Sequence, residues 1–272
     1  MRYLFFIILL FFAATSPGQI IMSHTGTVAP YCSSCSPGDP TDLMCEDAEG
    51  SNTIETGATD FTTAQCSDYT ASIDTGATLF EASHSGTLSC SNKGDNAIQI
   101  YCVNSAGGAD GVTLIKDVTD SNNSYASFYF NIVSEELDNG DVFGLMYYCN
   151  TDACDTNFNA GVSVKQNASG NLILNMKHRL ADNSTEENEG STTLSTGTWY
   201  RVELAWLSGT SATVYLNGSS EISDLDCRTD QTKAIGIGSD PVSWLSAISN
   251  DPITVQMDII GADDDTRVGA CE

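Results

Sequence analysis

The sequence is poor in positive charge. It has 10 lysines and arginines against 36 aspartates and glutamates, which gives a formal net charge of −26 at pH 7. A protein that binds nucleic acid or an anionic membrane surface through its charge needs a basic patch, so neither partner is expected. Anionic polysaccharides are disfavoured for the same reason, unless divalent cations bridge the two. We expect most of the acidic side chains to form a solvated surface that favours solubility.

Catalytic signatures are also missing. No nucleophile elbow, phosphate-binding loop or HExxH helix is present. Retaining glycoside hydrolases carry a pair of carboxylates about 5 Å apart, and no alternating ExDxE or ExDxxE pattern supplies such a pair here. Histidine occurs only at His24, His84 and His178. We therefore expect a binding or structural protein rather than an enzyme.

Long apolar runs are confined to the N-terminus. Arg2 precedes an unbroken apolar run from Leu4 to Phe12, and small residues follow it. This arrangement is typical of a secretory signal peptide, and the run is shorter than the roughly 20 residues of a transmembrane helix. We expect residues 1–18 to be a signal peptide, the chain to be secreted to the extracellular space or cell surface, and no membrane insertion. The Ser-, Thr-, Pro- and Gly-rich residues 19–41 are expected to form a tether.

Ten cysteines in an exported chain make disulfides the expectation. Cys32 and Cys35 have CxxC spacing, but no second ligand pair completes a zinc site, so we expect a disulfide near the N-terminus. Cys149 and Cys154 are expected to staple a loop between two strands. The sequence leaves the other pairings open.

From Leu43 onward, short apolar–polar alternation predicts β-strands, and no helical period is visible. The alternating segments are 127–132, 142–148, 162–165, 172–177, 199–206, 214–216, 235–237 and 253–259. Asn217-Gly218 follows one of them and favours a type I′ hairpin turn. One apolar and one polar face per strand suits antiparallel sheets packed face to face. We therefore predict an all-β sandwich of two antiparallel sheets, and we expect the polar run 182–190 to be a mobile loop.

Three motifs carry a family resemblance: Cys45–Gly50 (CEDAEG), Thr196–Leu204 (TGTWYRVEL) and Thr254–Ile260 (TVQMDII). They are similar to the CEDFEG, GTWYRVEL and TVYFDDI strands of the concanavalin A-like lectin/glucanase superfamily, in its bacterial LamG-like jelly-roll branch. Ala48 stands where an aromatic residue is usual, and the third motif keeps only one aspartate. The resemblance covers residues 42–272 and implies a disulfide-stabilised jelly-roll sandwich.

The resemblance also implies that the first and last strands lie side by side on one sheet. In the family a structural calcium often sits there. By position its ligands would be Asp47, Glu49 and Asp258, which suit a cation that prefers oxygen ligands. The same adjacency implies that Cys45 and Cys271 form a disulfide that closes the domain.

Sugar recognition needs aromatic side chains for the ring faces and polar groups for the hydroxyls. In a jelly roll such side chains sit on the concave sheet and in rim loops. The candidates are Tyr129, Tyr148, Lys165, Lys177 and Arg201, on the outward sides of predicted strands, and Trp244, beside Pro241 in a loop-like stretch. Trp199 and Trp206 are expected in the core.

Three functions follow from this reading. The first is a secreted, non-catalytic module that binds a polysaccharide or glycoconjugate or mediates adhesion. The second is a structural subunit of an extracellular filament or coat that self-assembles through the tether. The third is a divergent glycoside hydrolase or polysaccharide lyase. Lyases of this fold use Arg, His, Gln and Tyr on the concave sheet, and residues 160–166 resemble one of their strands only faintly, with Ser163 where the catalytic tyrosine would stand.

Overall fold

The computed structural model describes residues 42–46, 60–62, 68–73, 77–88, 96–102, 112–152, 154, 157–239, 251–264 and 267. These residues form strands and turns, and they include no helix that could cross a bilayer. The predicted signal peptide and tether lie outside the described residues, as do several predicted site residues. These are Cys32, Cys35, Asp47, Glu49, Trp244 and Cys271.

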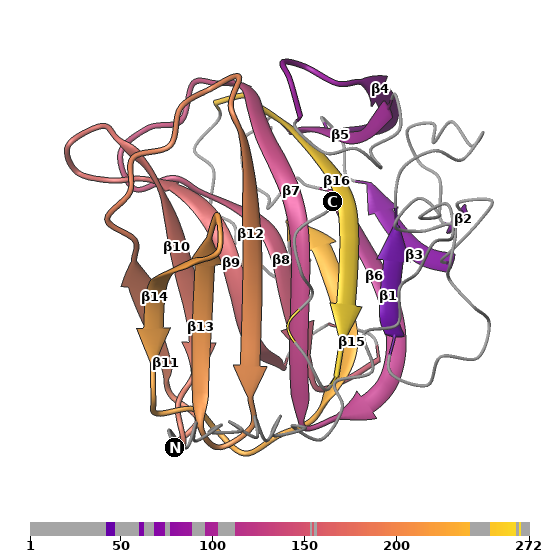
Figure 1. The fold of residues 1–272 in the computed structure, drawn as a ribbon, viewed down its shortest axis with the longest axis vertical. Helices are drawn as coiled ribbons and strands as arrows, with labels where there is room; N and C mark the ends of the chain where they lie inside the picture. The colour runs from indigo at the N-terminus through magenta and orange to yellow at the C-terminus, as the bar shows by residue number, and fades with distance from the viewer. Residues whose placement is uncertain are drawn as a thin grey trace, which may run out of the picture.

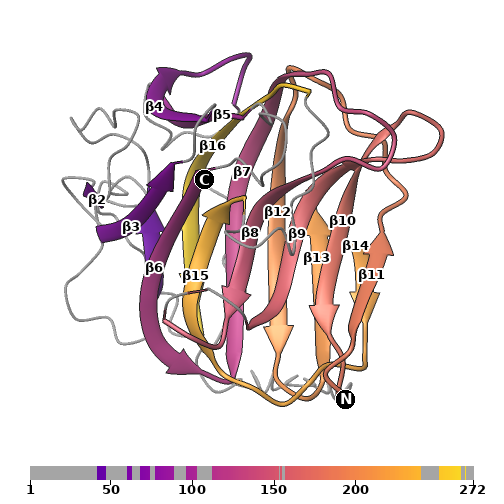
Figure 2. The same cartoon turned by 180° about the vertical axis from the view of Figure 1, so that it is seen from behind.

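Two eight-stranded antiparallel sheets form a sandwich, with sheet A in front in Figure 1 and sheet B in front in Figure 2. Sheet A consists of β1 (Asp42–Glu46), β4 (Thr78–Ser83), β5 (Asn96–Cys102), β7 (Asn123–Glu135), β12 (Trp199–Leu207), β13 (Ser211–Leu216), β14 (Ser219–Asp224) and β16 (Ile253–Asp263). Sheet B consists of β2 (Asp60–Thr62), β3 (Asp68–Ile73), β6 (Val112–Ser121), β8 (Val142–Cys149), β9 (Phe158–Gln166), β10 (Leu172–Arg179), β11 (Thr185–Glu189) and β15 (Thr232–Gly238). The predicted fold class is confirmed.

Strand order follows from long-range pairing. Sheet A runs β14-β13-β12-β7-β16-β5-β4, and sheet B runs β11-β10-β9-β8-β15-β6-β3-β2. The first and last described strands are neighbours, because Cys45 of β1 pairs with Gly261 of β16 and Glu46 pairs with Ile260. The adjacency that the family resemblance implies is therefore confirmed.

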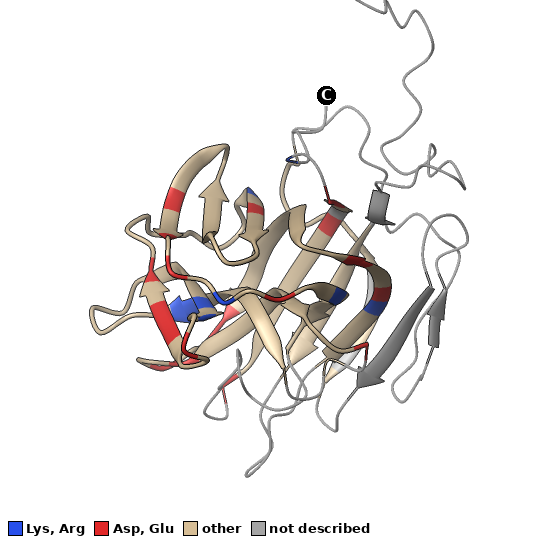
Figure 3. Ribbon diagram, turned by 90° about the horizontal axis from the view of Figure 1, so that it is seen from below, with Lys and Arg blue, Asp and Glu red and all other residues tan. Residues whose placement is uncertain are grey.

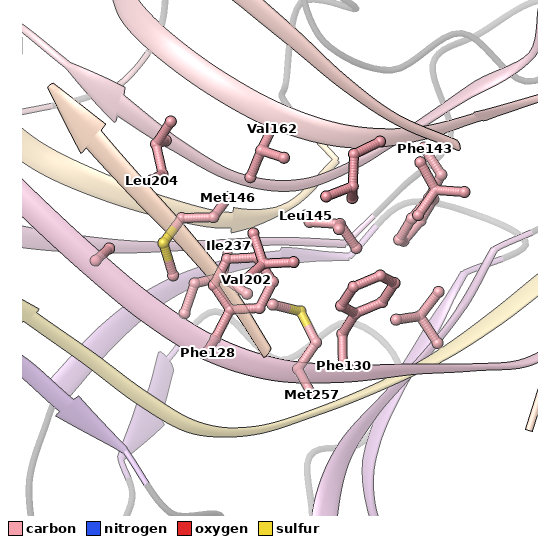
Figure 4. Close-up of a cluster of buried hydrophobic side chains, with 14 of the residues drawn as sticks. Phe128, Phe130, Phe143, Leu145, Met146, Val162, Val202, Leu204, Ile237 and Met257 are labelled. Atoms are coloured by element: carbon pink, nitrogen blue, oxygen red, sulfur yellow. The ribbon is translucent and has the colours of Figure 1, made fainter. Parts of the chain in front are cut away.

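The core lies between the two sheets and is built from the inward half of each alternating strand. Phe128, Phe130 and Met257 of sheet A face Phe143 and other apolar side chains of sheet B (Figure 4). Each of these side chains is fully buried, and burial of a side chain of this size stabilises the fold by roughly 1.5–3 kcal/mol. Trp206 is also fully buried, as predicted.

The alternation of β8 changes phase at a bulge. Phe143 and Leu145 point into the core, and the pairing with β9 then shifts register between Gly144 and Met146. An extra residue in one strand reverses the side to which the following side chains point. Met146 and Tyr148 therefore also join the core. The prediction that Tyr148 points outward is wrong for this reason.

The polar run 182–190 is not the predicted loop throughout. Residues 185–189 form β11, which pairs with β10 from Asn175↔Glu189 to Arg179↔Thr185. This edge strand has no apolar face, so its sequence shows no strand alternation, and pairing with β10 supplies its backbone hydrogen bonds. Glutamates along an unpaired edge also discourage pairing with another chain.

Two local predictions are confirmed. Asn217 and Gly218 have φ values of 50° and 85°, and a type I′ turn requires positive φ at both positions. They join β13 to β14. Cys149 and Cys154 form a disulfide with an S–S distance of 2.06 Å.

Candidate functional site

The outer side of sheet A carries partly exposed aromatic side chains, which alternate along each strand with residues that face the core. We call this surface the aromatic face, and it bears Tyr101, Tyr125, Tyr129, Trp199 and Tyr215. Because successive side chains of a strand point to opposite sides, these rings point away from the core. Polar residues stand beside them in rows across the strands. The rows are Trp199–Asn131–Gln256–Gln99, Arg201–Tyr129–Asp258 and Tyr215–Glu203–Ser127.

His84, which follows β4, lies over this face. Its Nε2 is 2.8 Å from Oδ2 of Asp258, and a carboxylate can only accept this hydrogen bond. The imidazole also contacts the ring of Trp199 edge-on, with 5.3 Å between ring centroids. The side chain of His84 is 6% exposed and that of Asp258 is 0% exposed. The pair therefore fixes the imidazole against the sheet.

The backbone of Ser85, next to His84, hydrogen-bonds to side chains of β16, β7 and β12. Its N–H donates to Oε1 of Gln256 at 2.6 Å. Its carbonyl accepts from Nδ2 of Asn131 at 2.6 Å and from Nε1 of Trp199 at 2.8 Å. Asn131 and Gln256 are almost fully buried, and these bonds compensate for their burial. Trp199 thus lies on the outer side of the sheet, and its predicted place in the core is wrong.

Two arginines share one glutamate on the same face. Nη2 of Arg201 is 2.6 Å from Oε1 of Glu203, while Nε and Nη2 of Arg267 lie 2.9 and 2.8 Å from its Oε2. The guanidinium of Arg267 stacks over Tyr215, 3.6 Å from the ring centroid. Arg201 packs under the β13–β14 hairpin, because a Cβ at Gly218 would lie only 3.0 Å from its Nη2.

The outer side of sheet B, which we call the lysine face, is arranged differently. Nζ of Lys165 lies 2.8 Å from a carboxylate oxygen of Glu187 and of Glu189 on β11. Burial lowers the pKa of Lys165, but the two glutamates outweigh this and raise its pKa. Ser163 and Asn175 are buried beside Lys165 and hydrogen-bond to each other at 3.2 Å. The charge of Lys165 is therefore already neutralised within the protein.

The predicted ligand residues divide between these two faces. Tyr129 and Arg201 are register partners on the aromatic face. Lys165 and Lys177 lie on β9 and β10 of the lysine face. Tyr148 belongs to neither, since it is fully buried and its hydroxyl donates to the carbonyl of Leu204 at 2.7 Å. The predicted set does not converge, because the outer sides of two stacked sheets point in opposite directions.

Sequence reasoning missed the contribution of His84, Asn131 and Gln256. His84 lies in a stretch that matches the family only loosely, and its partner Asp258 is 174 positions away. Asn131 and Gln256 carried a signal, because each is an amide between apolar neighbours of a regular strand. A polar residue at such a place indicates that something with hydrogen-bonding groups covers that side of the sheet.

The predicted calcium site falls mostly outside the described residues. Asp258 is described, and its carboxylate is buried beside His84. No group of three or more His, Cys, Asp or Glu side chains that could hold a metal ion is found among the described residues. An imidazole N–H directed at Asp258 is a poor neighbour for a dication. The described residues alone therefore do not fit calcium, and the expectation depends on Asp47 and Glu49.

Acidic residues dominate the surface. Asp and Glu positions are spread over the described strands and loops, and Lys and Arg positions are few (Figure 3). In the ion pairs away from the aromatic face, each cation has at least one carboxylate of its own. Lys165 has two glutamates, Arg228 pairs with Asp230, and Lys233 pairs with Asp120. The arginine pair around Glu203 departs from this pattern.

Only the comparison of structures finds known proteins that are similar to this chain. No family model matches the sequence, and no curated protein is detectably similar to it. Among solved structures, the cellulose induced protein Cip1 matches with a TM-score of 0.52 and 16% identity, over 74% of this chain and 93% of Cip1.

Two further matches have lower TM-scores. The receptor binding domain of botulinum neurotoxin type G matches at 0.47 with 11% identity, over 84% of this chain and 49% of the domain. This chain thus spans about half the length of that domain. The alginate lyase Aly36B matches at 0.47 with 14% identity, over 73% of this chain and 100% of the lyase. Sheet topology and the match to Cip1 confirm the predicted resemblance at the level of fold alone, a jelly-roll sandwich of two antiparallel sheets.

Proposed function

We propose that this chain is an exported, non-catalytic module that binds carbohydrate, or mediates adhesion through it, on the aromatic face. One observation carries the proposal. Partly exposed Tyr129 stands between Arg201 and Asp258 in a row across three strands. Aromatic rings present apolar faces to the C–H surfaces of sugars. The partly exposed Arg201 supplies hydrogen-bond donors for the hydroxyls, whereas Asp258 is buried beneath His84 and holds that imidazole in place.

Rigidity of this face supports the proposal. The contacts of His84 and Ser85 with β7, β12 and β16 hold the side chains around Tyr129 in place. Binding then loses less conformational entropy than it would on a flexible loop. The lysine face offers no comparable surface, because its one described tyrosine, Tyr147, is fully buried.

A direct test uses affinity electrophoresis on neutral and acidic polysaccharides. We expect the Tyr129→Ala variant to bind its preferred polysaccharide roughly tenfold more weakly than the unmodified chain. Tyr129→Phe keeps the ring and is expected to retain most of the affinity. Lys177→Ala, on the lysine face, is the matched control and should bind normally. Absence of binding to every glycan tested would refute the proposal. Trp244→Ala tests the remaining sequence candidate separately.

A lyase is the second candidate, and a specific observation favours it. The aromatic face brings together an arginine, a histidine, a glutamine and a tyrosine, the residue types that lyases of this fold use. They are Arg201, His84, Gln256 and Tyr129. The low exposure of His84 weighs against it, because a general base must reach the proton that it removes. Release of unsaturated product, followed near 235 nm and abolished in His84→Ala, would establish this activity.

The filament alternative depends on the tether 19–41, which lies outside the described residues. The charge of two sheet edges speaks against assembly by strand addition. β11 carries Glu186, Glu187 and Glu189, and β14 carries Glu221 and Asp224, so a second copy would meet like charges at these edges. A strictly monomeric protein on non-reducing gels and in negative-stain micrographs would eliminate this alternative.

Structural calcium remains a proposal supported by the adjacency of β1 and β16. It would need Asp47 and Glu49 as its main ligands. The melting temperature with calcium and with EGTA tests it, and an equal value under both conditions rules it out. The Asp47→Asn/Glu49→Gln variant should abolish any difference.

A further inference from the structure

Among the described residues, Arg201, Glu203 and Arg267 form a trio in which two cations share one carboxylate on the aromatic face. Both carboxylate oxygens of Glu203 are engaged, one by each arginine. Its side chain is 5% exposed, so the carboxylate is sequestered while it holds two cations. Within this trio positive charge exceeds negative charge by one, although the chain as a whole has a net charge of −26.

Arg267 is both oriented and accessible. Its side chain is 40% exposed, whereas that of Arg201 is 15% exposed. Glu203 engages Nε and Nη2 of Arg267, and Tyr215 supports the guanidinium plane from one side. The Nη1 group takes part in none of these contacts. A guanidinium fixed in this way keeps donors for a planar anion and loses little rotamer entropy on binding it.

The geometry also restricts what can bind. A guanidinium matches a carboxylate by two parallel N–H···O bonds, and such charge-assisted pairs are about twice as strong as neutral ones. Tyr215 is covered by Arg267 itself, and Tyr129, the register partner of Arg201, places a partly exposed aromatic ring near the trio. A sugar that carries a carboxylate would therefore find a guanidinium for its charge and an aromatic ring for its C–H surface.

We infer that Arg267, held by Glu203 and Tyr215, forms the subsite for the carboxylate of an acidic sugar, a uronate or sialate unit, within a glycan bound on the aromatic face. This inference rests on the proposed function and names its ligand class. It reverses the expectation that net charge disfavours anionic polysaccharides. Repulsion by distant surface charges is screened over about 8–10 Å in physiological salt, whereas the contact with Arg267 is direct.

The test compares each acidic glycan with a neutral partner of the same backbone. Suitable pairs are polygalacturonate and its carboxyl-reduced form, alginate and its carboxyl-reduced form, and 3′-sialyllactose and lactose, titrated by calorimetry. We expect one acidic member to bind at least about tenfold more tightly than its neutral partner, the change that loss of one charge-assisted hydrogen bond produces.

Two variants assign that preference to the subsite. Arg267→Gln should reduce the affinity for the acidic member to that for the neutral partner. Because it also removes an ion pair with the nearly buried Glu203, we expect a lower melting temperature, and affinities are compared well below the unfolding transition. Lys233→Gln removes the same charge from sheet B, where Lys233 pairs with Asp120 at 3.4 Å, and should keep the preference. Higher salt should weaken acidic binding more than neutral binding.

Distinct results would overturn the inference. Equal affinity for both members of every pair, or equal loss in Arg267→Gln and Lys233→Gln, refutes the carboxylate subsite but leaves the proposed function in place. Binding of dextran sulfate as tight as that of the acidic sugar, and equally dependent on Arg267, shows that the subsite takes anions in general and refutes the assigned class. Absence of binding to all the glycans refutes the proposed function itself.

Discussion

The two outer sides of this sandwich contain similar residue types and use them differently. On the lysine face, Lys165 is held between two glutamates, and Tyr147 is buried against Phe158, with 5.4 Å between ring centroids. On the aromatic face, rings remain partly exposed, and the two arginines share one glutamate. A charged or aromatic side chain on the outside of a sheet is therefore not by itself a binding residue. A side chain is available to a ligand only where other residues of the protein do not already bury it or neutralise its charge.

The two faces also differ in how they are covered. A small apolar cluster of Tyr147, Cys149, Cys154, Phe158 and Ala234 packs on the lysine face. On the aromatic face, His84 and Ser85 cover one part of the surface and hydrogen-bond to its polar side chains. Substitutions on the lysine face should therefore change stability, and those on the aromatic face should change binding.

The largest expected effect is at Gly236, under the ring of Tyr147. A Cβ at this position would lie 2.1 Å from two atoms of that ring. Gly236→Val should lower the free energy of unfolding by about 3 kcal/mol, because overpacking forces the ring or the backbone to move. Urea denaturation measures the loss. In a Tyr147→Ala background the same substitution should cost much less, and an equal cost in both backgrounds would show that the ring is not the obstacle.

The disulfide on the lysine face should separate stability from binding. Replacing Cys149 and Cys154 together by alanine opens a short loop, and the chain-entropy model assigns about 2 kcal/mol to a loop of this length. We expect that loss in denaturation experiments, together with unchanged glycan affinity. Tyr129→Ala should show the reverse pattern. A loss of affinity in the disulfide variant would mean that the two faces are coupled.

Acid should weaken the sandwich where β10 of sheet B meets β14 of sheet A. His178 is fully buried on the core side of β10, with Nε2 3.7 Å from Oδ2 of Asp224. Burial lowers the pKa of His178, and Asp224, Glu186 and Asp226 offset this only in part. The folded state therefore binds fewer protons than the unfolded state as pH falls below about 6.5, and the free energy of unfolding should fall by up to about 1.4 kcal/mol per pH unit.

His178→Leu isolates this effect. Urea denaturation between pH 5 and 8 should give a shallower acid slope for the variant than for the unmodified chain, and the difference belongs to His178. All other titratable groups are the same in both proteins, so their contribution cancels in the difference. Identical slopes would show that His178 carries the same proton affinity in the folded and unfolded states.

The smallest expected effect is at Lys165. Its ion pairs lie at a partly exposed sheet edge, where such pairs contribute about 0.2–1 kcal/mol. Lys165→Gln should lower the free energy of unfolding by less than about 1 kcal/mol and leave glycan affinity unchanged. Arg201→Gln, its counterpart on the aromatic face, should reduce affinity at least tenfold by our proposal. Equal effects of the two substitutions on affinity would remove the distinction between the faces.

Much of the fold could be predicted because strand alternation is a local signal. The segment 199–206 alternates regularly, and β12 spans Trp199–Leu207, one residue longer, with the predicted inward set. β8 shows the limit. Its residues look equally regular, but a bulge opposite β9 turns Tyr148 into the core. Nothing within β8 reveals the bulge, because it is a property of the pairing between two strands.

The candidate site was predictable in part for the same reason. The outward positions of Tyr129 and Arg201 follow from alternation in their own strands. The two residues lie side by side because β7 pairs with β12. Lys165 does not belong to the candidate site because it lies in the other sheet. Glu203 could not be identified as a shared anchor, because Arg201 is two positions away while Arg267 is 64 positions away.

The sequence by itself determined which side of most strands is apolar, the type I′ turn at Asn217-Gly218 and the disulfide between Cys149 and Cys154. Each depends on residues within a few positions, whose geometry the local backbone fixes. Tertiary structure alone decided that residues 185–189 form a strand, and that His84 and Ser85 contact Asp258 and Trp199. These outcomes depend on hydrogen bonds and charges supplied by distant segments, and a side chain's own neighbours in sequence carry no record of them.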